Sequence, residues 1–267
     1  MSILKTITRR YLGARSNPAG KPGARAYAVG DIHGRCDLLD DLLGQIKTDI
    51  DASTPAETFV VFLGDLIDRG PDSRNVIERL VNFPLQGVRP IFLSGNHEEV
   101  LLKVLDAQPG VLQDWLRYGG SQCSASYGVD PAALKRMGDV EGAAALAAAI
   151  PIAHVEFLTS LGDTFRFGDY LFVHAGIRPG IPIHEQSRRD LRWIREPFLS
   201  DGGEHGLIVV HGHTVSAGVD ERPNRIGIDT GAYESGMLTA LVVEEENRRY
   251  LSAKRGGTAR PLQWPLE

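Results

Sequence analysis

Residues 26–34 read AYAVGDIHG, an apolar run followed directly by polar residues between two glycines. The apolar run predicts a β-strand that ends at Gly30. Leucines at helical spacing in residues 37–50 predict a helix directly after the polar residues. A strand, a short turn and a helix in this order form the first unit of an α/β fold.

The same unit recurs twice in the first half of the chain. Apolar runs at residues 58–64 and 90–95 predict strands, and helical patterns at 73–81 and 98–105 follow them. Three such units imply a largely parallel or mixed sheet with right-handed crossovers. Further β runs in the second half indicate another sheet, with strands closer to hairpin order. These runs are residues 164–167, 170–174, 207–211, 225–229 and 237–243.

Residues 108–160 interrupt this pattern. They are helical in character, and Pro109, Pro131 and Pro151 punctuate them. We therefore expect a helical insertion over the edge of the sheet, inside a single domain of residues 26–267.

The composition excludes several classes of protein. The 267 residues are 42% hydrophobic and 24% charged, which is ordinary for a globular protein. No stretch approaches the ~20 apolar residues of a transmembrane segment. Cys36 and Cys123 alone cannot form a disulfide framework, so a cytoplasmic setting is expected. The net charge of -5 argues against a dedicated nucleic-acid binder. A cytosolic enzyme remains the favoured class.

Basic residues are concentrated at the N-terminus. Residues 1–25 contain six basic and no acidic residues, whereas the other 23 basic residues oppose 34 acidic ones. We predict a basic N-terminal arm made of a short helix and a flexible linker. The alternative is an arm that contacts an anionic surface or docks on a partner.

Polar clusters follow five of the predicted strands. They lie at residues 30–34, 64–70, 95–98, 172–176 and 210–214. Ligands of open α/β sheets bind at the carboxyl ends of strands, so we expect these clusters to converge. Two Asp, one Asn and three His of these clusters are candidate metal ligands and none is a thiolate, a set that suits Mn, Fe or Zn. Six ligands indicate two ions that share a carboxylate, activate a bridging hydroxide and hold a phosphoryl group for in-line attack.

The motifs GDIHG, GDLIDRG, GNHE, HAG and HGHT occur in this order over about residues 26–243. Each motif alone is weak, but the ordered series resembles the phosphoprotein-phosphatase family of calcineurin-like metallophosphoesterases. It is most similar to the bacterial serine/threonine protein phosphatases, which also have a segment similar to DLRWIREPF at residues 190–198. The resemblance implies an α/β fold of two mixed β-sheets, packed as a sandwich and flanked by helices.

The resemblance also implies six ligands for two divalent metal ions, with Asp65 shared between the ions. Asp31 and His33 would join Asp65 at the first ion. Mn²⁺ is the favoured metal, with Fe or Zn as alternatives. The ligands at the second ion would be Asn96, His174 and His213.

Catalysis and phosphate binding are implied at neighbouring positions. His97 would be the general acid that protonates the leaving oxygen, and Asp68 would orient it. Arg69 and Arg195 would bind the non-bridging phosphate oxygens, with Asn96 beside them. The implied activity is phosphomonoester hydrolysis, most of all on phosphorylated serine or threonine of a protein. Phosphotyrosine and small phosphoesters are further candidate substrates.

Two other functions share this pattern. A symmetrical dinucleoside polyphosphate hydrolase has the same metal core, but such relatives often lack the Asp of Asp-Arg-Gly, which this chain keeps as Asp68. A non-catalytic scaffold would have lost ligands, and none is lost here. The fourth motif has Ala175 where eukaryotic relatives usually have Gly, a change that removes no ligand.

Five further residues lie in or near the motifs. His211 is expected to line the site, because His213 matches the Gly-His-Thr of the family. Arg192 could share the phosphate role or form a surface salt bridge. Cys36 is expected to be a buried helical thiol rather than an oxidation-sensitive one. Glu98 is expected to cap its helix. Asp229 could support a ligand histidine or form a turn at a strand end.

Overall fold

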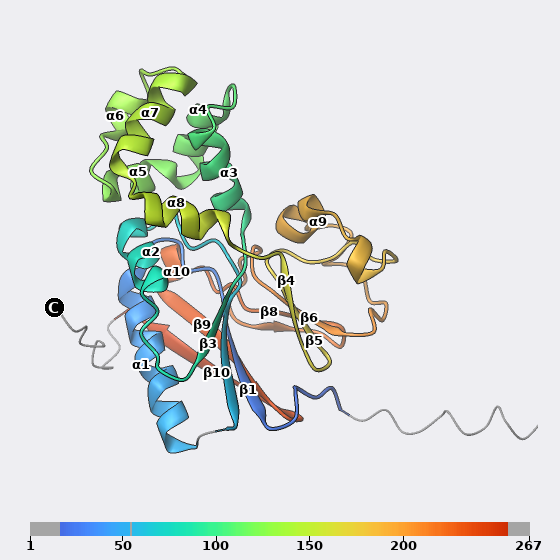
Figure 1. Ribbon diagram of the computed structural model, residues 1–267. Helices are drawn as coiled ribbons and strands as arrows, with labels where there is room; N and C mark the ends of the chain where they lie inside the picture. The colour runs from blue at the N-terminus through green and yellow to red at the C-terminus, as the bar shows by residue number, and fades with distance from the viewer. Residues whose placement is uncertain (1–16, 54, 256–267) are drawn as a thin grey trace, which may run out of the picture.

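The computed structural model describes residues 17–53 and 55–255 and contains two five-stranded β-sheets stacked face to face (Figure 1). The first sheet has the order β10-β9-β1-β2-β3. Its parallel strands are β1 (Ala24–Val29), β2 (Glu57–Phe62) and β3 (Arg89–Phe92). The antiparallel strands β9 (Met237–Glu244) and β10 (Asn247–Lys254) extend the sheet beside β1.

The second sheet has the order β4-β5-β6-β8-β7. Its central strands β5 (Tyr170–Val173), β6 (Ile208–His211) and β8 (Arg225–Gly227) are parallel. Its edge strands β4 (Thr164–Phe167) and β7 (Asp220–Glu221) pair antiparallel with β5 and β8. Both sheets are therefore mixed, as predicted. The expectation that the second sheet has strands closer to hairpin order is wrong for its centre, because β5, β6 and β8 pair in parallel.

Alternate residues of β1 face opposite layers. Ala26 and Ala28 pack between the sheets, whereas Tyr27 and Val29 pack against the helices outside the first sheet. Those helices are α1 (Cys36–Ala52) and α2 (Ser73–Val81), and the leucines at helical spacing in α1 are buried. The short helix α9 (Arg188–Trp193) covers the outer face of the second sheet. The predicted helix-sheet-sheet-helix sandwich is confirmed.

The expectation that residues 237–243 belong to the second sheet is wrong. These residues form β9, which pairs with β1 in the first sheet. All but its end residues are buried, because one face meets the opposing sheet and the other meets the helices. The edge strand β10 was not predicted, because its exposed polar side chains hide the β pattern.

The region predicted to be a helical insertion contains several helices, which gather at one end of the molecule (Figure 1). Its buried residues, Leu112 and Leu146 among them, join the same apolar cluster as the leucines of α1. The insertion therefore shares its core with the rest of the domain. Its elements are α4 (Val111–Trp115), a π-helical turn (Leu116–Gly120), α5 (Ser121–Ser126), α6 (Pro131–Leu134), α7 (Asp139–Ala149) and α8 (Ile152–Thr159).

The N-terminal arm and the absence of a transmembrane segment were also predicted. Residues 1–16 of the predicted basic arm lie outside the described residues, and β1 begins at Ala24, two residues before the predicted start of the domain. Among residues 17–53 and 55–255, no single helix is long and apolar enough to cross a membrane. Only α7 and α8 taken together pass that test, across a bend of 108°.

Candidate active site

The carboxyl ends of strands from both sheets meet at one place. Asp31 and His33 follow β1, and Asp65 follows β2. From the second sheet, His174 follows β5 and His213 follows β6. The His213 backbone N–H donates to Asp31 Oδ2 at 2.9 Å, which joins the two sheets directly. His33, Asp65 and His213 have φ values of 46°, 48° and 62°. Left-handed backbone at non-glycine residues is uncommon and collects at functional sites.

Asp65 lies at the centre of these side chains. Its Oδ2 is 3.5 Å from His33 Nε2, and its Oδ1 is 3.4 Å from His174 Nε2. Two groups of potential metal ligands share this carboxylate, one with His33 and His97 and the other with His174 and His213. In each group the donor atoms lie within 4.8 Å of one another. Such an arrangement can hold two cations on one carboxylate.

The hydrogen bonds of two histidines determine which nitrogen is free. His33 Nδ1 is 2.8 Å from the Ile67 carbonyl, and His174 Nδ1 is 2.9 Å from the Leu63 carbonyl. A carbonyl only accepts, so each Nδ1 carries the proton and each Nε2 presents a lone pair. Burial lowers the pKa of both imidazoles, that of His33 to about 3, which keeps them neutral. The lone pairs then face Asp65 oxygens, an arrangement that a cation between them would stabilise.

The position of Asn96, the first residue of α3 (Asn96–Leu105), completes the second group. Its Oδ1 is 3.1 Å from His174 Nε2 and 3.0 Å from His213 Nδ1. The structure thus brings the two histidines expected at the second ion, His174 and His213, within hydrogen-bond distance of Asn96 Oδ1.

Asp31 adds a third carboxylate oxygen to the buried cluster. Burial raises the pKa of Asp31 well above its usual value, and the neighbouring Asp229 and Asp65 act in the same direction. Asp31 Oδ1 and His213 Nε2 are buried without a hydrogen-bond partner in the described part of the chain. Crowded carboxylates and an orphaned oxygen fit divalent metal ions, because cations offset the cost of burying these charges.

His97 and Asp68 form the hydrogen-bonded pair that the motifs imply. His97 Nδ1 is 2.7 Å from Asp68 Oδ2, and both side chains are buried. Burial would lower the pKa of His97, but the nearby Asp65 and Asp68 carboxylates raise it to about 9. His97 Nε2 faces the metal-ligand cluster, 3.9 Å from Asp65 Oδ2. A protonated imidazole here can donate a proton to a group bound at the cluster.

The two expected phosphate-binding arginines lie beside this cluster. The Arg69 guanidinium lies over the ring of Tyr233 at 4.9 Å, and that ring is 5.3 Å from His33. Arg195 Nη2 donates to the His213 carbonyl at 3.4 Å, and its side chain is exposed. Tyr233 belongs to no motif, so the sequence did not single it out.

Arg192 and His211 lie outside the metal-ligand groups. Arg192 Nη2 pairs with Asp163 at 2.6 Å, which supports the salt-bridge interpretation. His211 Nδ1 lies 3.0 Å from the Gly212 carbonyl, and its ring packs against Phe198. His211 is therefore buried beside Phe198, and its role as a residue lining the site stays a prediction.

Glu98 caps α3 as expected and also holds the loop that carries Asp65. Its carboxylate accepts the backbone N–H of Gly95, the residue that precedes the helix, at 2.8 Å. It also accepts the backbone N–H groups of Asp65 at 2.9 Å and Leu66 at 2.8 Å. The contacts between Glu98 and this loop span more than 30 residues of sequence, so the local helix signal could not predict them.

Asp229 and Cys36 both lie buried near the motifs. Asp229 Oδ1 accepts the Gly231 N–H at 2.9 Å, as a turn residue does, and its carboxyl also contacts Asp31. These contacts support the turn interpretation, while support of a ligand histidine by Asp229 stays a prediction. Cys36 is buried, and burial raises the pKa of its thiol to about 12.

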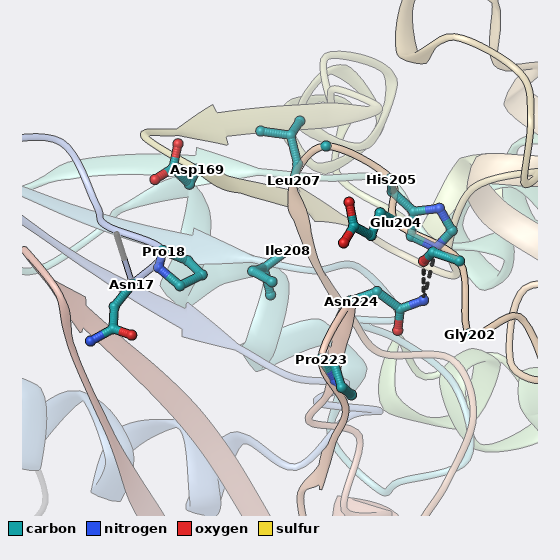
Figure 2. A pocket seen from close by; sticks show the side chains of 12 residues that line it. Asn17, Pro18, Asp169, Gly202, Glu204, His205, Leu207, Ile208, Pro223 and Asn224 are labelled. Atoms are coloured by element: carbon teal, nitrogen blue, oxygen red, sulfur yellow. Dashed lines mark hydrogen bonds between the residues drawn. The ribbon is translucent and has the colours of Figure 1, made fainter. Parts of the chain in front are cut away.

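A pocket of about 660 Å³ lies elsewhere on the molecule (Figure 2). Asp169 and Leu207 line it and precede β5 and β6, whereas the metal-ligand residues follow those strands. The Asn224 amide in this pocket already donates to the carbonyls of Asp201 and Gly203. This pocket contains none of the expected site residues.

Comparison with known proteins agrees with this geometry. The model of the family described as calcineurin-like phosphoesterase matches residues 24–234. "Serine/threonine-protein phosphatase 1" of Salmonella typhimurium is 28% identical over 229 residues, covering 82% of this chain and 91% of the relative. A symmetrical bis(5'-nucleosyl)-tetraphosphatase of Ralstonia nicotianae is 36% identical over 78 residues, covering 29% of this chain and 24% of the relative.

A solved structure of similar fold is the cold-active protein-tyrosine phosphatase of a psychrophilic Shewanella, with a TM-score of 0.51 at 20% identity. The superposition covers 86% of this chain and 82% of the other. The family model spans every strand that ends in the cluster and all of the residues that form the two metal-ligand groups. The chain belongs to the calcineurin-like phosphoesterase family, whose members are hydrolases that use divalent metal ions.

Proposed function

We propose that this phosphoesterase is a protein phosphatase that acts on phosphoserine and phosphothreonine. The observation that carries the proposal is the 2.7 Å contact between His97 and Asp68. An alkoxide is a poor leaving group, so a serine or threonine phosphate needs a proton donor beside the scissile oxygen. A nucleotide leaving group is a much weaker base and needs this donor less.

In the proposed mechanism, each residue has one task. Two divalent ions, which we propose to be Mn²⁺, supply an activated water nucleophile and positive charge at the phosphoryl group when bound. Arg69 and Arg195 hold the non-bridging oxygens and orient the phosphorus for in-line attack. His97 gives its Nε2 proton to the leaving oxygen. Asp68 keeps the His97 Nδ1 proton in place and stabilises the imidazolium.

The ligands of the two ions are proposed from the same geometry. Asp31 and His33 would hold the first ion and Asp65 both ions. The second ion would bind to Asn96, His174 and His213, whose donor atoms surround Asp65. Asn96 would also contact the phosphate. We further propose a cytoplasmic location, because both cysteines are free thiols in the interior of the protein.

A symmetrical dinucleoside tetraphosphate hydrolase is the second candidate. The local match to the Ralstonia nicotianae tetraphosphatase supports this alternative. A rate comparison separates the two in enzyme reconstituted with Mn²⁺. Its substrates are phosphoserine, phosphothreonine and phosphotyrosine peptides and diadenosine tetraphosphate. The highest kcat/KM on the tetraphosphate would overturn our proposal, and activity that survives complete removal of metal by a chelator would overturn the mechanism.

The role of His97 has its own test. His97→Ala should lower kcat on a phosphoserine peptide by ~10²–10⁴-fold, the usual contribution of a general acid. The loss should be much smaller on p-nitrophenyl phosphate, whose leaving group needs little protonation. His184→Ala, which removes an exposed histidine, is the matched control and should leave both rates unchanged. Equal losses on both substrates with both metals retained would exclude the general-acid role.

A further inference from the structure

The indole of Trp115 binds the carboxylate that orients His97. Trp115 is the last residue of α4 in the helical insertion, and its Nε1 donates to Asp68 Oδ2 at 3.0 Å and to Oδ1 at 3.2 Å. Asp68 Oδ2 is the same atom that His97 Nδ1 contacts at 2.7 Å. Both Trp115 and Asp68 are buried, at 2% and 0% exposure. The insertion thus reaches the proposed catalytic pair directly.

The chain around Trp115 is shaped for this contact. A Cβ added at Gly120 would lie 2.2 Å from the Trp115 ring, so only glycine leaves room for the indole. Gly119 has a φ of 121°, and its carbonyl accepts the Arg69 N–H at 3.0 Å. Residues 115–120 of the insertion therefore fix both Asp68 and the backbone of the adjacent Arg69.

Among the described residues, the Asp68 carboxylate has few strong hydrogen-bond donors besides the Trp115 indole. Burying a carboxylate without hydrogen bonds costs free energy. Burial raises the pKa of Asp68, whereas the hydrogen bonds from His97 and Trp115 lower it. The Cys123 thiol also faces Asp68, but a thiol is a weak donor. Trp115 is thus the strong neutral donor that fixes the rotation of the carboxylate and aims its Oδ2 at His97.

We propose that Trp115 is a positioning residue for proton donation by His97, so that the helical insertion controls leaving-group reactivity. This inference rests on the roles proposed above for His97 and Asp68. The indole N–H keeps the Asp68 carboxylate in the orientation that accepts the His97 Nδ1 proton. His97 Nε2 then points at the leaving oxygen. Without the indole donor, the carboxylate turns and the imidazole loses its fixed direction.

Trp115→Phe removes the donor and keeps an aromatic ring in the apolar pocket. In Mn²⁺-reconstituted enzyme, kcat on a phosphoserine peptide should fall by about 10-fold, the rate equivalent of ~1.4 kcal/mol. KM and the rate on p-nitrophenyl phosphate should change by less than about twofold. Tyr127→Phe is the matched control, because it removes another buried hydrogen bond of the insertion, to His154 at 2.9 Å, without touching Asp68. It should leave the ratio of the two rates unchanged.

A second substitution removes the effect of ring size. Replacement of Trp115 by benzothienylalanine keeps the shape of the indole and exchanges only the N–H for sulfur. It should reproduce the selective loss even if Trp115→Phe fails to fold. In an Asp68→Asn background, Trp115→Phe should add less than about twofold, because the carboxylate on which it acts is gone. Equal losses on both substrates, or full additivity with Asp68→Asn, would overturn the inference.

A spectroscopic measurement separates this inference from the proposed function. In protein loaded with diamagnetic Zn²⁺, the His97 Nδ1 proton should give a low-field NMR signal because it is held against Asp68. This signal should shift or disappear by solvent exchange in the benzothienylalanine variant and persist in Tyr127→Phe. An unchanged signal would refute the positioning role. A wild-type protein that hydrolyses neither ester would refute the proposed function, and the NMR comparison would still decide the role of Trp115.

Discussion

Gly212→Ala is expected to disturb the metal site through a single steric contact. A Cβ at this position would lie 1.9 Å from Asp31 Oδ1 and 3.0 Å from Asp31 Cγ. Carbon and oxygen atoms without a bond between them approach to about 3.3 Å at the closest comfortable distance. The Gly212 N–H is bound to the His174 carbonyl at 2.8 Å, so the backbone is held and the carboxylate must move by more than about 1 Å.

The magnitude follows from the role proposed for Asp31. Changes that misdirect a metal ligand typically lower metal affinity by ~10–100-fold, or about 1.4–2.7 kcal/mol. A displacement of about 1 Å at a reacting centre costs on the order of 10²-fold in rate. We therefore expect Gly212→Ala to lose the first ion selectively and to lower kcat on p-nitrophenyl phosphate by roughly 100-fold.

The assay combines metal analysis after dialysis, competition with a chelator of known affinity, and kcat at saturating Mn²⁺. Gly218→Ala is the control in the same loop, because a Cβ there meets nothing within 4 Å. Thermal melting of both metal-free variants shows whether the fold survives. A folded Gly212→Ala protein that binds two ions with wild-type affinity would refute the proposed position of Asp31 at the first ion.

Three further predictions concern stability and thiol chemistry. Glu98→Gln should lower the free energy of unfolding of the metal-free protein by roughly 2–4 kcal/mol in urea, because an amide cannot replace the carboxylate that accepts several buried N–H groups. Glu99→Gln is the control and should cost about 1 kcal/mol or less. The native protein should resist alkylation at Cys36, since burial raises the pKa of this thiol to about 12, and rapid labelling at pH 8 by mass spectrometry would contradict this. Burial also raises the pKa of Tyr27 to about 12, so this phenol keeps its proton in the native state while the unfolded chain releases it near pH 10. The free energy of unfolding should therefore fall from about pH 10 to 12, by roughly 2–3 kcal/mol for Tyr27, and Tyr27→Phe should reduce that fall.

The amino-acid pattern alone predicted an α/β fold with two sheets and the convergence of the polar residues that follow the strands, whereas the packing of the sheets as a sandwich was implied by the family resemblance of the motifs. This succeeded because the signals are local. The apolar runs of β1 and β2 and the leucine spacing of α1 each record the surroundings of their own element. The polar motifs sit directly after strands, and the carboxyl ends of parallel strands meet at one edge. The position of Asp65 near the other expected ligands follows from these two facts.

Other features depend on contacts between distant parts of the chain, and only the tertiary structure decided them. The continuous apolar pattern of β9 indicates that both of its faces are buried, but it does not indicate which strand lies beside it. The pairing of β9 with β1 is therefore known only from the tertiary structure. Trp115 lies 47 residues from Asp68 in sequence and in no motif, yet the packing of the insertion brings its N–H to the carboxylate. Periodicity encodes how buried a side chain is, whereas the identity of its partner is fixed by how whole elements pack.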